Sequence, residues 1–133
     1  DHADDDDDRR WPVKKLATIT LLGVAALLGG CGNHYSTHTF DQVQTPAGGQ
    51  VSTQSVRVPL GAAAKAHVMA YDDDGHRMNG DVRSSDPTVL DVQNLVTGDD
   101  DWVFLGRRAG HVEIQLYANG VLERTIPADV LAN

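Results

Sequence analysis

Cysteine is nearly absent from this chain, because only Cys31 among its 133 residues carries a thiol. A single cysteine cannot form an intramolecular disulfide, so a folded domain must be held together by its apolar core. Basic residues are also scarce, eleven against nineteen acidic ones, and the formal charge is −8. Such a chain repels phosphate groups, which excludes nucleic acid as an expected partner.

Catalytic motifs are missing as well. The sequence contains no Gly-x-Ser-x-Gly elbow, no His-Glu-x-x-His pair and no phosphate-binding loop. His67 and His111 fall on the expected outward faces of strands, where exposed histidine is ordinary. We therefore expect no enzyme activity, no catalytic residue and no cofactor.

What the chain does have is a short apolar run near its start. Lys14 and Lys15 precede thirteen uncharged residues, Leu16–Leu28. As a helix these residues would extend about 20 Å, against a ~30 Å hydrocarbon core, so a signal peptide is favoured over a permanent membrane span.

The run ends in Leu28-Gly29-Gly30-Cys31, which resembles the lipobox of bacterial lipoprotein signal peptides. The resemblance implies cleavage between Gly30 and Cys31, and diacylglycerol on the Cys31 thiol as a membrane anchor. Gly32 stands where an aspartate would imply retention at the inner membrane, so the outer membrane is favoured. The alternative is an ordinary secretory signal peptide followed by an incidental cysteine.

The residues before this run fit a signal peptide poorly, because 1–8 hold six aspartates. We expect 1–12 to be an N-terminal extension or an incorrect start, with translation beginning at Val13 and the signal peptide covering 13–30. A twin-arginine signal at Arg9-Arg10 is the alternative.

Residues 31–50 are expected to form the lipidated cysteine and a flexible linker, because they are polar and contain Pro46 and Gly48-Gly49. His34 and His38 would bind a metal only on a helix, which their neighbours disfavour, so we expect no metal site. Phe40 has two alternatives, packing on the domain or joining a first strand. Without 1–30 the chain keeps seven basic and thirteen acidic residues, a formal charge of −6.

Residues 51–133 have the alternation and turn spacing of an all-β domain, with about seven antiparallel strands in an Ig-like sandwich. A small open barrel is the alternative. Val112, Ile114 and Leu116 alternate with polar residues, and Asn119-Gly120 predicts a two-residue hairpin turn. The expected strands are Val51–Leu60, Ala64–Tyr71, Asp81–Ser84, Val89–Val92, Trp102–Leu105, His111–Ala118 and Val121–Ile126.

Three segments in order, Tyr71–Gly75, Ser84–Val92 and Gly106–Ile114, resemble the bacterial Ig-like group 2 (BIG2) domain. The resemblance covers about residues 51–126 and implies the same sandwich. It departs at Val82, where family members often carry tryptophan, and Trp102 is expected to fill the core from another strand.

Three groups of residues allow a functional interpretation as well as a structural one. The Asp72–Gly75 segment partly resembles a calcium loop, and Asp99–Asp101 would join it only if the two loops meet; solvated turns are favoured. Arg107-Arg108 is a candidate contact for an acidic partner. Tyr71, Tyr117 and Trp102 could form a contact face, although packing is favoured.

Two functions remain. The first is a lipid-anchored adhesion or binding module whose partner is a glycan or an envelope protein. The second is a structural accessory docking onto an envelope complex or the cell wall. Fold alone does not separate them.

Overall fold

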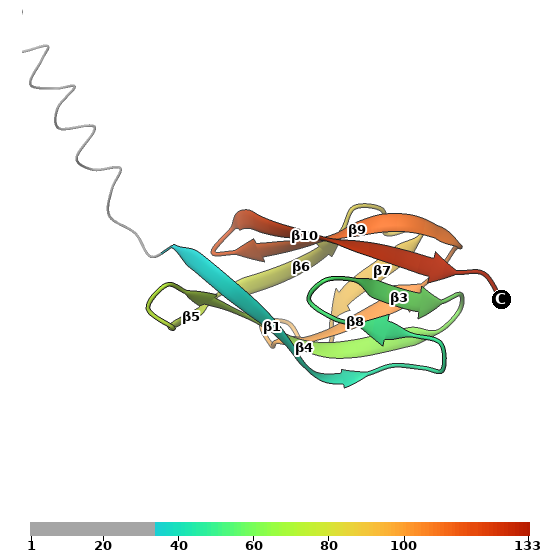
Figure 1. The fold of residues 1–133 in the computed structure, drawn as a ribbon, viewed down its shortest axis with the longest axis horizontal. Coiled ribbons are helices and arrows are strands. Elements are labelled where there is room, and N and C mark those ends of the chain that lie inside the picture. Colours follow the sequence, from blue (N-terminus) through green and yellow to red (C-terminus); the bar gives the residue numbers. More distant parts are fainter. Residues whose placement is uncertain (1–33) are drawn as a thin grey trace, which may run out of the picture. The chain divides into compact units, whose positions relative to one another are not determined.

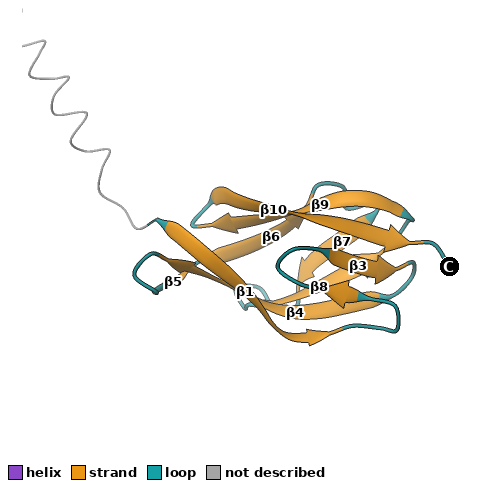
Figure 2. Cartoon of the chain, in the orientation of Figure 1, coloured by secondary structure: helices purple, strands orange, loops and turns teal. Residues whose placement is uncertain are grey.

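Residues 34–133 are described in a computed structural model, where strands joined by turns make up the secondary structure (Figures 1 and 2). None of these residues belongs to a helix long and apolar enough to cross a membrane. The strands are β1 (Tyr35–Gln44), β2 (Gln50–Val51), β3 (Val56–Pro59), β4 (Ala63–Asp72), β5 (Arg77–Met78), β6 (Gly80–Ser84), β7 (Leu90–Asn94), β8 (Asp101–Gly106), β9 (Gly110–Ala118) and β10 (Val121–Leu131).

The strands form two sheets packed as a sandwich. Sheet A has the order β1-β4-β8-β7, with β5 paired to one end of β4, and sheet B has the order β2-β3-β10-β9-β6. The expected sandwich is confirmed and the barrel is not, but the strands number ten in the described part of the chain rather than about seven. One pair, β3 with β10, is parallel, whereas every pair was expected to be antiparallel.

The core lies between the sheets and follows the predicted alternation. Val112, Ile114 and Leu116 of β9 are buried, as are Ala66 and Val68 of β4. The largest side chains that are fully buried are Phe104, Leu90, Ile114, Leu116, Ile126, Val56 and Val58. Alternating apolar residues on facing sheets thus supply the core that a domain without a disulfide requires.

The β9–β10 connection is the predicted hairpin. Ala118 pairs with Val121, and the two turn residues have positive φ, 49° at Asn119 and 82° at Gly120. Both angles are those of a type I′ turn, whose twist matches that of the flanking strands.

Three strand boundaries differ from expectation. The expected strand Val51–Leu60 is two strands, because Ser52 Oγ accepts the Ser55 N–H at 3.1 Å and closes a turn between β2 and β3. Strand β5 was not expected at all. Strand β10 runs five residues past Ile126, because Ala128–Leu131 pair with β3.

The flexible linker expected at 31–50 is wrong for half of its length, because Tyr35–Gln44 form β1 at the edge of sheet A. This strand is held by backbone pairing with β4 and has no fully buried side chain. Phe40 fulfils both alternatives, because it belongs to β1 and its ring stacks on Phe104 with centroids 6.4 Å apart. An edge strand solvated on much of its surface lacks apolar alternation, which is why it resembled a linker.

The signal-peptide predictions lie outside the described residues. They comprise the extension 1–12, the signal peptide 13–30, the cleavage site Gly30–Cys31 and the lipidation of Cys31.

Candidate functional site

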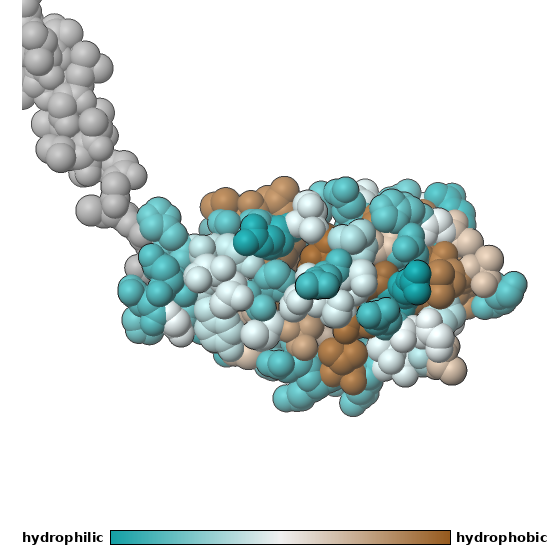
Figure 3. Space-filling view, viewed as in Figure 1, coloured by the Kyte–Doolittle hydropathy of each residue, from teal (hydrophilic) through white to brown (hydrophobic). Residues whose placement is uncertain are grey.

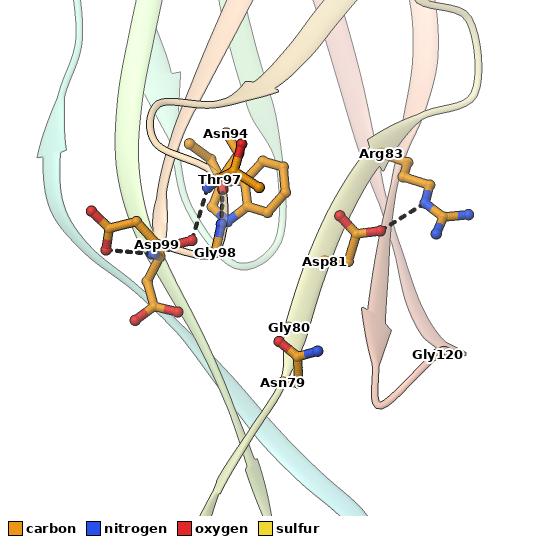
Figure 4. Close-up of a pocket in the computed structure, with 11 residues that line it drawn as sticks. Asn79, Gly80, Asp81, Arg83, Asn94, Thr97, Gly98, Asp99 and Gly120 are labelled. Carbon is orange, nitrogen blue, oxygen red and sulfur yellow. Dashed lines mark hydrogen bonds and ion pairs between the residues drawn. The ribbon is translucent and has the colours of Figure 1, made fainter.

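A cleft of about 460 Å³ opens at the surface between the β7–β8 turn and the start of β6 (Figure 4). We call it the polar cleft. Trp102 of β8 contributes to its wall and is 7% exposed. The residues lining it are Asn79, Gly80, Asp81, Arg83, Asn94, Thr97, Gly98, Asp99, Asp100, Trp102 and Gly120.

The β7–β8 turn on one side of the cleft is held in shape by Asn94. Its side-chain amide donates to the carbonyl oxygens of Asp99 at 2.8 Å and Asp101 at 3.0 Å, and its Oδ1 accepts the Gly98 N–H at 3.0 Å. Gly98 has φ +85°, a conformation that L side chains rarely adopt. The turn therefore presents carboxylates from a fixed backbone.

Charges at the cleft are largely paired. Arg83 Nε lies 2.8 Å from Asp81 Oδ2, and Asp100 pairs with Arg77. The described residues that line the cleft include no serine, cysteine, lysine or histidine, and Thr97 supplies the one hydroxyl side chain among them. Carboxylates, amides and a guanidinium can hold the hydroxyl groups of a polar ligand.

Sequence reasoning considered Asp99–Asp101 only beside the Asp72–Gly75 loop and gave Asn79-Gly80 no functional role. It missed that the two segments line one cleft, because β6 and β7–β8 belong to different sheets and their approach depends on the packing of the sandwich.

The two aspartate loops considered for calcium do not share a site in the described residues. Asp72, Asp74 and His76 have ligand-type atoms within 4.8 Å of one another, without Asp99–Asp101. Asp72 is 3% exposed, and its Oδ1 accepts the N–H groups of Asp74 at 3.0 Å and His76 at 2.8 Å. Those bonds close the β4–β5 turn, so the carboxylate has a structural task there.

The basic dipeptide is engaged with acidic neighbours. Arg107 Nη2 lies 2.8 Å from Asp91 Oδ2, and Arg108 Nη2 lies 3.8 Å from Asp86 Oδ2. The two arginines therefore form solvated ion pairs at a turn, and they do not form a basic patch for an acidic partner.

The three aromatic residues do not gather on one face. Trp102 is in the core, as the alternative placement expected. Tyr117 on β9 lies beneath Arg83, whose Cζ is 4.3 Å from the ring centroid, and Tyr71 is on β4 of the other sheet. The aromatic contact face is therefore not formed.

Both outward histidines pair with aspartates of neighbouring strands. His67 Nδ1 is 3.2 Å from Asp101 Oδ1, and His111 Nδ1 is 2.8 Å from Asp129 Oδ1. His67 Nε2 also lies 4.0 Å from Asp100 Oδ2, so this ring contacts two carboxylates.

His38 is the exception among the histidines, because it lies on β1 with its Nε2 buried and without a hydrogen-bond partner. Its Nδ1 lies 2.5 Å from the Tyr35 hydroxyl oxygen, at hydrogen-bond distance. Burial, and then the charge of Arg124, lower the pKa of His38 below its ordinary 6.5. His34 precedes β1 and His38 lies within it, so the two histidines do not share a helix.

The lowered pKa predicts how stability depends on pH. The unfolded chain takes up a proton on His38 below about pH 6.5, while the folded chain resists it, so stability is full above this pH and is lost as pH falls through the folded pKa. We expect urea denaturation at about pH 7.5 and 5.5 to show a smaller acid-induced loss in His38→Gln. The exposed His34 is the matched control; an equal reduction in His34→Gln would contradict the assignment.

Together the fold and these sites define a small all-β sandwich with a polar surface cleft. No family model and no curated protein matches the chain. Among solved structures, domains 4 and 5 of the S-layer protein SbsC match with TM-score 0.55 and 19% identity, over 76% of this chain and 54% of that one. Domains 4–9 of surface layer protein SbsC match with TM-score 0.56 and 18% identity, over 77% of this chain and 15% of that one. The chain thus corresponds to about half or less of these structures, and the likeness establishes the fold alone.

Proposed function

We propose that this chain is the precursor of a non-enzymatic bacterial lipoprotein, cleaved before Cys31, lipidated on that thiol and held at the outer membrane. Its sandwich acts as a binding module of the cell envelope and belongs to the BIG2-like domains. The observation that carries the proposal is Cys31 itself. It is the chain's sole cysteine, it follows the apolar run and Leu28-Gly29-Gly30, and it precedes the first strand by four residues.

Two further observations support the proposal. The domain builds its core without a disulfide, so the thiol is free for a lipid. The matching solved structures are domains of a surface layer protein, which is consistent with an envelope location. For adhesion, the polar cleft is the hollow whose amides and carboxylates suit the hydroxyl groups of a glycan.

Replacing Cys31 tests the anchor. In bacterial cells expressing the full chain we expect labelled palmitate to enter the protein, and its N-terminal peptide to begin at Cys31 with diacylglycerol attached. The Cys31→Ser variant should incorporate no label and lose this modified peptide, because serine lacks the thiol that the lipid requires. Asn33→Ser, two residues away, is the matched control and should be labelled normally. Unlabelled wild-type protein, or a precursor still joined across Gly30–Cys31, would contradict the proposal.

The second candidate is a structural accessory docking onto an envelope complex or the cell wall. The short stretch between Cys31 and β1 favours it, because a lipid on Cys31 would leave the domain little reach away from the membrane. Crosslinking in intact cells, followed by identification of the partners, separates the two functions. Recovery of a resident envelope complex supports the accessory, whereas recovery of an external ligand supports adhesion.

A further inference from the structure

We propose that the tip of the β9–β10 hairpin inserts into the headgroup layer of the membrane that holds the lipid of Cys31, an inference that rests on the proposed lipid anchor. The tip has two consecutive apolar residues at the beginning of β10. Val121 is 57% exposed and Leu122 is 46% exposed. Apolar side chains exposed at a turn are costly in water and are stabilised at a membrane interface.

The tip lies at the end of the sandwich where the described chain begins. Val121 and Asn119 line one hollow together with His34 and Tyr35. Figure 1 shows the start of β1 and the β9–β10 hairpin at one end of the domain, and the C-terminus at the other. Figure 3 shows apolar surface above the start of β10.

Chain length then limits how far this end can be from the bilayer. His34 is three residues after Cys31, a span of at most about 11 Å. The headgroup layer of one leaflet is itself about 5–8 Å thick. A lipid on Cys31 would therefore hold His34, and the hairpin beside it, close to the interface.

The polar residues around the tip suit the same position. Arg124 lies over the Tyr35 ring, with its Cζ 5.4 Å from the ring centroid, so a cation and an aromatic ring flank the apolar pair. Tyrosine and arginine are both residues that settle at headgroup level. Glu123 precedes Arg124 in the sequence, so this pair adds no net charge to the tip. The acidic β4–β5 turn lies at the same end, because the Asp73 N–H donates to the His34 carbonyl oxygen.

A fluorescent dye at the tip tests the proposal. Lipidation consumes Cys31, so a cysteine introduced by Leu122→Cys is the one free thiol of the mature chain. The lipidated protein is labelled with an environment-sensitive dye and reconstituted into vesicles of phosphatidylethanolamine and phosphatidylglycerol in equal parts, with nitroxide groups on the acyl chains. We expect blue-shifted emission and loss of most of it to the nitroxide. Ala132→Cys, at the opposite end of the domain, is the matched control and should keep its emission.

The outcomes separate this proposal from the lipid anchor. The mass of the protein first shows whether Cys31 carries the lipid. If it does, and the dye at residue 122 keeps the emission of a dye in water, the hairpin contact is overturned and the lipid anchor stands. Dye that reacts with Cys31 of the unsubstituted protein shows a free thiol and overturns both. Val121→Cys provides a second label at the tip, and quenching there as strong as at residue 122 supports the insertion.

Discussion

Phe104→Ala is expected to lower the free energy of unfolding by about 3–5 kcal/mol, the usual cost of truncating a buried aromatic side chain. Phe104 lies on β8 in the middle of sheet A and is 0% exposed. Its ring also stacks on Phe40, so the cavity would undermine the packing of β1. Because small domains have only about 5–15 kcal/mol of stability in total, this one change removes a large share of it.

Urea denaturation of the full chain, followed by far-ultraviolet circular dichroism, measures the loss as a lower midpoint at unchanged slope. Leu105→Ala is the matched control, because Leu105 is the next residue of β8 and its side chain is partly exposed on the opposite face of the strand. We expect it to cost about 1 kcal/mol or less. Equal losses at the two positions would mean that the alternation along β8 does not define the core.

The elements that the sequence predicts well are those whose side chains alternate strictly. In β9, Val112, Ile114 and Leu116 all point inward because one face of sheet B meets the core and the other meets water. The Asn119-Gly120 turn is equally local, since its positive φ values follow from the residues that adopt them. Local patterning of this kind needs no knowledge of the rest of the fold.

Features set by distant partners were not predictable in the same way. Strand β1 forms because its backbone pairs with the edge of β4. Its polar residues do not indicate this pairing partner. The last residues of β10 follow Pro127, which indicates a strand end until β3 is known to pair alongside Ala128–Leu131. Both errors arise because pairing through the backbone does not require a particular pattern of side chains, so the sequence does not reveal it.

The candidate functional features also differ in whether the sequence alone predicts them. Cys31 and the apolar run before it are a contiguous signal, so a sequence alone suffices to propose a lipid anchor. The polar cleft joins Asp81 and Arg83 of β6 to the turn around Asp99, on the other sheet. Only the packing of the two sheets brings these groups together.

Gly106→Ala is expected to destabilise the domain by about 1–3 kcal/mol, because an added methyl group has no room where the two sheets meet. A Cβ at residue 106 would lie 2.7 Å from the Pro59 carbonyl oxygen and 3.0 Å from Val130 Cγ1. The neighbouring backbone is itself tied down. The Gly61 N–H donates to the Gly106 carbonyl oxygen at 2.8 Å, and the Gly106 N–H donates to the Ala62 carbonyl oxygen at 3.0 Å. The strands cannot separate to make space without losing these bonds.

Gly80→Ala is the matched control for this substitution. Gly80 also lies in a strand, β6, but a Cβ there would meet only Ala70 Cβ, at an ordinary 4.0 Å. Alanine also restricts the unfolded chain, so this variant should be neutral or more stable by up to about 1 kcal/mol. Thermal unfolding of both variants therefore gives shifts of opposite sign or very different size. A Gly106→Ala melting temperature at or above that of the parent would show that β3 and β10 can move away from β8, and that the sheets are not fixed to each other at this end.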